Sequence, residues 1–187
     1  MISPKLESGE IRTIAFSLGV SFLESKEMEQ QMKSIILKLR SHFTESELEV
    51  IFHHSLESRF LSTHNATNKH LLGHQRFAKW LLSNDIKYKD ISGSAENLVD
   101  CYSAVDLNIG YRVHAHIYMT SIGKRSVLIS EDGRGKALKS MCDGLILDGV
   151  DTISASFSHR VYRRLGISSG YKVASSIPRE VLGQLIY

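Results

Sequence analysis

Short runs of branched and aromatic residues alternate along the chain with longer segments in which apolar residues recur every three or four positions. Runs of the first kind are typical of buried β-strands, and segments of the second kind are typical of amphipathic helices. Strands are predicted to begin near Arg12, Leu48, Tyr88, Asp106 and Ser126. Helices are predicted after Ser21 and over residues 69–82, 95–105, 115–122 and 133–142.

Local signals at the helix ends support this division. Ser21 and Glu24 have the spacing of a capping box, and Ser94 is placed to cap the helix that follows it. The segment that follows Ser21 carries its apolar residues on one helical face, and these are Met28, Met32, Ile35, Ile36 and Leu39. A sixth strand is predicted over 144–149, and closing helices over 152–166 and 178–186.

The regular alternation of strands and helices predicts the fold class. Strand and helix patterns that take turns at this spacing indicate βαβ units, whose strands run parallel and whose helices cover the sheet. The sequence therefore predicts an α/β protein with a Rossmann-like, mostly parallel sheet and helices on both faces. The length of 187 residues fits one such domain spanning residues 1–187.

Composition narrows the function classes. The chain is 42% hydrophobic and 23% charged with 2 prolines, which is typical of a globular protein. A net charge of +3 without a basic run interleaved with aromatics gives no argument for nucleic-acid binding, and leaves a small anionic ligand open. The sequence shows no leader-like start and no apolar run long enough for a transmembrane segment, so a cytoplasmic location is predicted. Cys101 and Cys142 are expected to be buried free thiols.

The ends of the predicted strands carry hydrogen-bond donors, cations and glycines. The carboxyl ends of parallel strands meet at one edge of the sheet, where ligands bind. Backbone N–H groups at helix starts suit an anion, and arginine grips phosphate or carboxylate through two parallel hydrogen bonds. The candidate binding residues at these ends are Ser17, Gly19, His53, His54, Arg112, His114, Ser130, Glu131 and Arg134.

Structural explanations compete with these assignments. An arginine at a strand end is often a salt-bridge partner. His53 and His54 alternate across the sheet, so at most one of them faces a given side. His116 is expected to be a core or surface histidine without a catalytic role, and Glu131 fits a capping role for the next helix. No metal-ligand spacing, P-loop, nucleophile elbow or dinucleotide fingerprint is found, so no metal and no cofactor are predicted.

The stretch "SAVDLNIGYRVHAHIYMTSIGKRSVLISED" resembles the signature region of the polysaccharide pyruvyl transferase family. In that family a helix leads to an aspartate, a hydrophobic strand and a G-x-R-x-H-a element, followed by a helix, a second strand and a polar turn. The resemblance is densest over residues 103–136 and extends loosely from about Arg12 to the C-terminus. It implies a Rossmann-like domain similar to the C-terminal, donor-binding half of a two-domain GT-B-like transferase.

The resemblance also implies an activity. Such enzymes transfer a pyruvyl group from phosphoenolpyruvate, a co-substrate, onto sugar hydroxyls in polysaccharide biosynthesis and form a ketal. Arg112 and His114 match the arginine and histidine that contact phosphoenolpyruvate, and are the implied catalytic residues. The chain covers what resembles the C-terminal half of the family's members. Three alternatives follow: the acceptor-binding half is a missing N-terminal domain, it is a partner chain, or the chain is a reduced relative with another function.

Two other functions remain open from the sequence. A GT-B-like glycosyltransferase domain would bind a nucleotide sugar, with Glu131 holding the ribose and Arg112 the diphosphate. A module without catalytic activity would bind an anionic metabolite or act as a scaffold.

Overall fold

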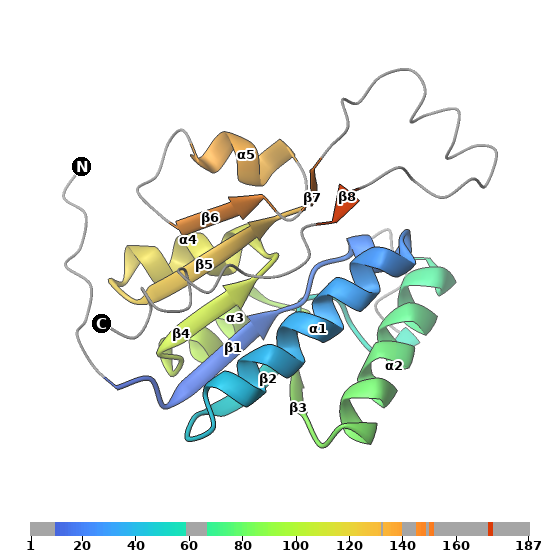
Figure 1. Ribbon diagram of the computed structural model, residues 1–187, viewed down its shortest axis with the longest axis horizontal. Helices are drawn as coiled ribbons and strands as arrows, with labels where there is room; N and C mark the ends of the chain where they lie inside the picture. The colour runs from blue at the N-terminus through green and yellow to red at the C-terminus, as the bar shows by residue number, and fades with distance from the viewer. Residues whose placement is uncertain are drawn as a thin grey trace.

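The computed structural model describes residues 10–58, 67–131, 133–139, 145–148, 150–151 and 172–173. Its centre is a six-stranded, all-parallel sheet in the order β3-β2-β1-β4-β5-β6. The strands are β1 (Thr13–Ser17), β2 (Glu47–Phe52), β3 (Lys87–Asp90), β4 (Leu107–Gly110), β5 (Arg125–Ser130) and β6 (Leu145–Asp148). The predicted α/β, Rossmann-like class is therefore confirmed, and the five predicted strand starts each agree with the structure to within one residue (Figure 1).

Helices connect the successive strands. They are the 3-10 helix η1 (Ser21–Leu23), α1 (Lys26–His42), α2 (Asn68–Ser83), α3 (Ala95–Ser103), α4 (Val113–Ser121) and α5 (Gly133–Lys139). Two short antiparallel strands, β7 (Val150–Asp151) and β8 (Lys172–Val173), form a separate pair. The predicted closing helices and Cys142 lie outside the described residues.

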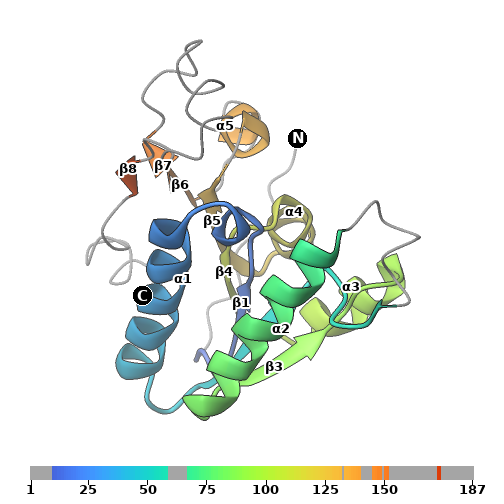
Figure 2. The same cartoon turned by 90° about the vertical axis from the view of Figure 1, so that its right-hand side faces the viewer.

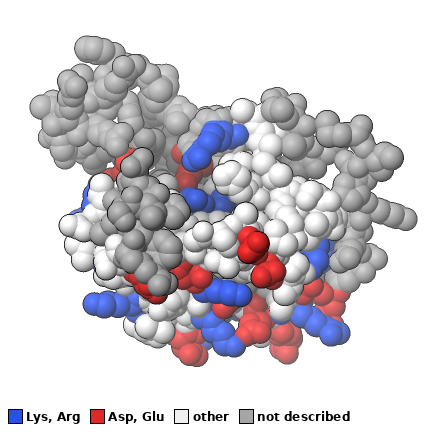
Figure 3. All heavy atoms as spheres, turned by 180° about the vertical axis from the view of Figure 1, so that it is seen from behind, with Lys and Arg blue, Asp and Glu red and all other residues white. Residues whose placement is uncertain are grey.

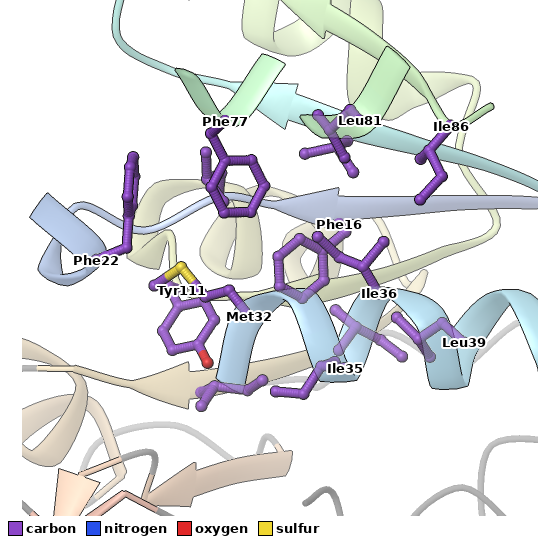
Figure 4. Packing of buried hydrophobic residues seen from close by; sticks show 14 of the residues in the cluster. Phe16, Phe22, Met32, Ile35, Ile36, Leu39, Phe77, Leu81, Ile86 and Tyr111 are labelled. Carbon is purple, nitrogen blue, oxygen red and sulfur yellow. The ribbon is translucent and has the colours of Figure 1, made fainter. Parts of the chain in front are cut away.

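Two apolar clusters show that helices cover both faces of the sheet. One cluster joins α1 and α2 to alternate residues of β1, β2, β4 and β5, and Figure 4 shows Phe16, Ile36 and Phe77 meeting in it. The other cluster joins α3 and α4 to the opposite side of the sheet through residues such as Ala15, Ile51 and Met119. Figure 2, which views the sheet from its side, shows α1 and α3 separated by the strands.

The predicted capping box at Ser21 and Glu24 is wrong. Ser21 begins only the 3-10 turn, and its hydroxyl donates to the carboxylate of Glu131, 2.6 Å away. The helix α1 begins five residues later at Lys26, and its N-cap is Ser25, whose Oγ accepts from the Met28 N–H. The apolar face predicted from Met28 onward is buried as expected.

Asp106 ties the start of β4 to the start of β1. Its Oδ2 accepts from the backbone N–H groups of Arg12 at 3.0 Å and Thr13 at 2.9 Å, and from the Thr13 hydroxyl at 2.8 Å. These contacts fix the relative position of the two central strands at the amino end of the sheet, opposite the edge where the candidate site lies.

The described surface mixes charges of both signs. On the face that Figure 3 displays, Lys and Arg side chains lie among Asp and Glu side chains, and the described atoms show no large patch of one sign.

Candidate functional site

The candidate site lies at the topological switch point of the sheet, between β1 and β4. In the order β3-β2-β1-β4-β5-β6, the connections run one way from β1 and the other way from β4, and ligands of such sheets bind beyond the carboxyl ends at this point. Ser17 and Gly110 are the paired last residues of β1 and β4. A Cβ on Gly110 would lie 2.3 Å from the Ser17 carbonyl oxygen, so glycine is required for the strands to meet this closely.

Arg112 is the N-cap residue of α4 and is held from several sides. Its backbone N–H points to the Ser17 Oγ at 3.4 Å. The residue before it, Tyr111, packs its ring edge-on against Phe16 with 6.0 Å between centroids, and donates its hydroxyl to Gln31 of α1 at 2.9 Å. The turn that carries Arg112 is therefore anchored to β1 and to α1.

His53 and Tyr102 form a second part of the site. His53 follows β2 and is partly buried, and its Nε2 lies 2.8 Å from the Tyr102 hydroxyl of α3. Tyr102 is fully buried. We call Ser17, His53, Tyr102, Arg112 and His114 the Arg112 cluster.

The electrostatics of the Arg112 cluster keep His53 neutral. Burial lowers the pKa of His53 to about 3, and coulombic interactions with Arg112, His54 and His114 act in the same direction. Burial raises the pKa of Tyr102 well above its ordinary value. Both rings are therefore uncharged at neutral pH, and the lasting charge of the cluster is the Arg112 guanidinium.

His54 is partly buried and lies beside the buried His74 of α2. The two ring centroids are 5.7 Å apart, and His74 donates from Nδ1 to the carbonyl oxygen of His70 at 2.7 Å. Burial lowers the pKa of His74, with Arg112 acting in the same direction. The structure thus divides the predicted pair, because His53 contacts Tyr102 of α3 whereas His54 lies by α2.

Glu131 does not cap the helix that follows it but closes the turn after β1. Its Oε2 accepts from the backbone N–H groups of Val20 at 3.2 Å and Ser21 at 3.1 Å, in addition to the Ser21 hydroxyl. A Cβ on Gly19 would lie 2.4 Å from the same Oε2 and 2.8 Å from the Tyr111 Cβ. A carboxylate of the chain itself therefore occupies the donors at this turn.

A cavity of about 270 Å³ lies beside the Glu131 turn. It is lined by Val20, Ser21, Leu23, Glu24, Ser25, Met28, Lys69, His70 and Glu131. Arg112 and His114 are not part of this lining, so the cavity and the Arg112 cluster are separate features of the same edge.

The remaining predicted residues lie toward β5. Ser130 ends β5 and is buried against α5, where a Cβ on Gly135 would approach its Oγ to 2.5 Å. Arg134 is exposed on α5. The structure therefore brings together Ser17, His53, Arg112 and His114, places Gly19 with Glu131, and leaves Ser130 and Arg134 as a third group.

The sequence reasoning missed Tyr102. It lies on the buried face of α3, where the apolar pattern explains its ring, but a buried tyrosine hydroxyl requires a polar partner. The need of this hydroxyl for a polar partner was the signal in the sequence that could have pointed to Tyr102.

His116, expected in the core or on the surface, is 1% exposed and belongs to a buried polar group. The Ser126 Oγ lies 2.9 Å from the His116 Nδ1 and accepts from the Asn108 Nδ2 at 2.9 Å. Among the residues that the structure describes, neither the His116 Nε2 nor the Asn108 Oδ1 has a hydrogen-bond partner. Burial lowers the pKa of His116 to about 4.

Comparison with known proteins gave no assignment. No protein-family model, curated protein or solved structure matches this chain. Within the described residues, no three His, Cys, Asp or Glu side chains are grouped so that they could hold a metal ion. In the same part of the chain, no helix combines the length and apolar character needed to cross a membrane.

Proposed function

We propose that this chain is the donor-binding domain of a polysaccharide pyruvyl transferase-like enzyme and binds phosphoenolpyruvate at the Arg112 cluster. The observation that carries the proposal is the position of Arg112 and His114, which follow β4 directly where the strand order changes, next to His53 and Ser17. Phosphoenolpyruvate carries a phosphate and a carboxylate, and a guanidinium binds either group through paired hydrogen bonds.

The reaction assigns roles to these residues. Ketal formation adds a proton to the methylene carbon and two sugar hydroxyl oxygens to C2, and releases phosphate. One hydroxyl proton is in effect transferred to the new methyl group and the other leaves with the phosphate. Arg112 holds the donor anion, and His114, exposed on the first turn of α4, is the acid and base that moves these protons. On this proposal a second Rossmann-like domain, in the same protein or a partner, holds the acceptor sugar.

Calorimetric titration tests the proposal. We expect weak binding of phosphoenolpyruvate to the chain, and at least about a tenfold loss of affinity in Arg112→Ala, because charge-assisted contacts are the strongest available. His114→Ala should lose less, and Arg76→Ala, an exposed arginine of α2, serves as the matched control. Absence of binding, or equal losses in Arg112→Ala and Arg76→Ala, would contradict the proposal.

A nucleotide-sugar-binding domain is the second candidate. One observation favours it, because Glu131 lines the cavity of about 270 Å³ together with Lys69 and His70. Titration with uridine diphosphate separates the two candidates. Binding of uridine diphosphate without binding of phosphoenolpyruvate would replace the first proposal with the second.

A further inference from the structure

The hydrogen bonds of the Arg112 cluster have a definite direction. The backbone N–H of Arg112 can only donate, so the Ser17 Oγ accepts from it. The Tyr102 hydroxyl is fully buried, and a buried hydroxyl that does not donate is left with an unsatisfied proton. The Tyr102 proton must therefore point to an acceptor.

The position of His53 fixes the direction of this proton. Within the described part of the chain, the hydrogen-bond partner of the Tyr102 hydroxyl is the Nε2 of His53, 2.8 Å away. The Tyr102 O–H therefore donates to the His53 Nε2. A neutral imidazole that accepts at Nε2 carries its proton on Nδ1.

We propose that His53 is a binding residue of the Arg112 cluster, a neutral imidazole that donates from Nδ1–H to an anion held by Arg112, and that Tyr102 is the positioning residue that fixes this tautomer. The partly buried His53 lies close enough to Arg112 and His114 for their charges to act on it. A neutral donor next to a guanidinium adds a hydrogen bond to an anion without adding a second charge that would repel the first.

The surroundings of His53 support a fixed neutral state. Arg112 and His114 face it from the turn after β4 and from α4, His54 adjoins it after β2, and Tyr102 faces it from α3. The coulombic effect of Arg112, His54 and His114 on His53 is repulsion of an added proton. The choice of phosphoenolpyruvate as the ligand rests on the proposed function, whereas the tautomer of His53 does not.

Nuclear magnetic resonance of the ¹⁵N-labelled chain tests the tautomer directly. Two-bond ¹H–¹⁵N correlations distinguish the nitrogen that carries the proton, and we expect Nδ1–H for His53 throughout pH 5 to 8, with and without inorganic phosphate. A His53 ring that carries its proton on Nε2, or that titrates in this range, would overturn the inference.

Variants of Tyr102 test its positioning role. Tyr102→Phe removes the donor to Nε2, so His53 should show a mixture of tautomers or begin to titrate, while Tyr118→Phe on α4 should leave the His53 signals unchanged. An unchanged tautomer in Tyr102→Phe would exclude the positioning role, because a residue that only fills space would give this result.

Variants of His53 test the donor. The amide nitrogen of Asn overlays the ring Nδ1, whereas that of Gln overlays Nε2, so His53→Asn should keep the affinity for inorganic phosphate within about twofold and His53→Gln should lose roughly fivefold or more. Equal losses in both variants, or no phosphate binding by the unmodified chain, would overturn the donor role. If inorganic phosphate binds as expected but phosphoenolpyruvate does not, the proposed function fails and this inference stands.

Discussion

The buried His116 is expected to make the stability of the protein depend on pH. Its pKa is about 4 in the folded chain, against about 6.5 for an exposed histidine. Well above pH 6.5 the His116 ring is neutral in both the folded and the unfolded chain. In that range it does not make the free energy of unfolding depend on pH. As the pH falls below 6.5 the unfolded chain takes up a proton first, so the free energy of unfolding falls until the pH reaches the folded pKa.

The size of this effect follows from the two pKa values. The linkage relation gives a loss of roughly 2 kcal/mol between pH 7 and pH 5, and about 3 kcal/mol by pH 4, from this one ring. The pKa values of His53 and His74 are also lowered, so these two histidines contribute in the same direction. The quantity that isolates His116 is therefore the difference between the original chain and a variant that cannot titrate at this position.

The suitable variant is His116→Asn, because its side-chain oxygen can still accept from Ser126. Urea denaturation at pH 7, 6 and 5 gives the free energy of unfolding of each protein. The variant should be less stable at pH 7, because it leaves space where the ring was, but its loss from pH 7 to pH 5 should be about 2 kcal/mol smaller. His42→Asn, at an exposed position of α1, is the control. Parallel pH profiles for the original chain and His116→Asn would refute the reasoning.

Three further substitutions test contacts at the ends of strands. Denaturation at pH 7 gives the free energy of unfolding of each variant. Gly110→Ala should destabilise by about 1 to 3 kcal/mol, because its Cβ would overlap the backbone of Ser17; a change below about 0.5 kcal/mol would show that the strands can separate freely. Glu131→Gln should cost about 1 to 3 kcal/mol, because the charge-assisted bonds to Ser21 and its neighbour are weakened, and an increase in stability would contradict this account. Asp106→Asn should destabilise by about 1 to 2 kcal/mol, because the hydrogen bonds from the backbone N–H groups of Arg12 and Thr13 are weakened. An unchanged denaturation midpoint would show that those contacts are dispensable.

Much of the fold was predictable because its determinants are local. Buried parallel strands need short, branched, apolar runs, and amphipathic helices need a recurring apolar face, so both are visible in windows of a few residues. The capping box predicted at Ser21 was wrong because the Ser21 hydroxyl is hydrogen-bonded to Glu131, which is 110 residues away in sequence. A spacing rule for Ser21 and Glu24 contains no information about that competitor.

The Arg112 cluster was predictable in part for a related reason. Strand ends of one parallel sheet meet at one edge, so Ser17, His53 and Arg112 could be placed near one another from the strand assignments. Tyr102 reaches that edge from the helix that crosses to β4, and its direction depends on the packing of α3 against the sheet. Helical periodicity showed that this ring is buried, but did not show which polar atom its hydroxyl meets.

The anchoring of Tyr111 has a consequence for the entropy of ligand binding. A loop that must become ordered around a ligand lowers the affinity by the conformational freedom it loses. Here the ring of Tyr111 is packed against Phe16 and its hydroxyl is bonded to Gln31, so the backbone next to Arg112 is already ordered in the folded chain. If the proposed anion binds at Arg112, little conformational entropy of this backbone would be lost on binding.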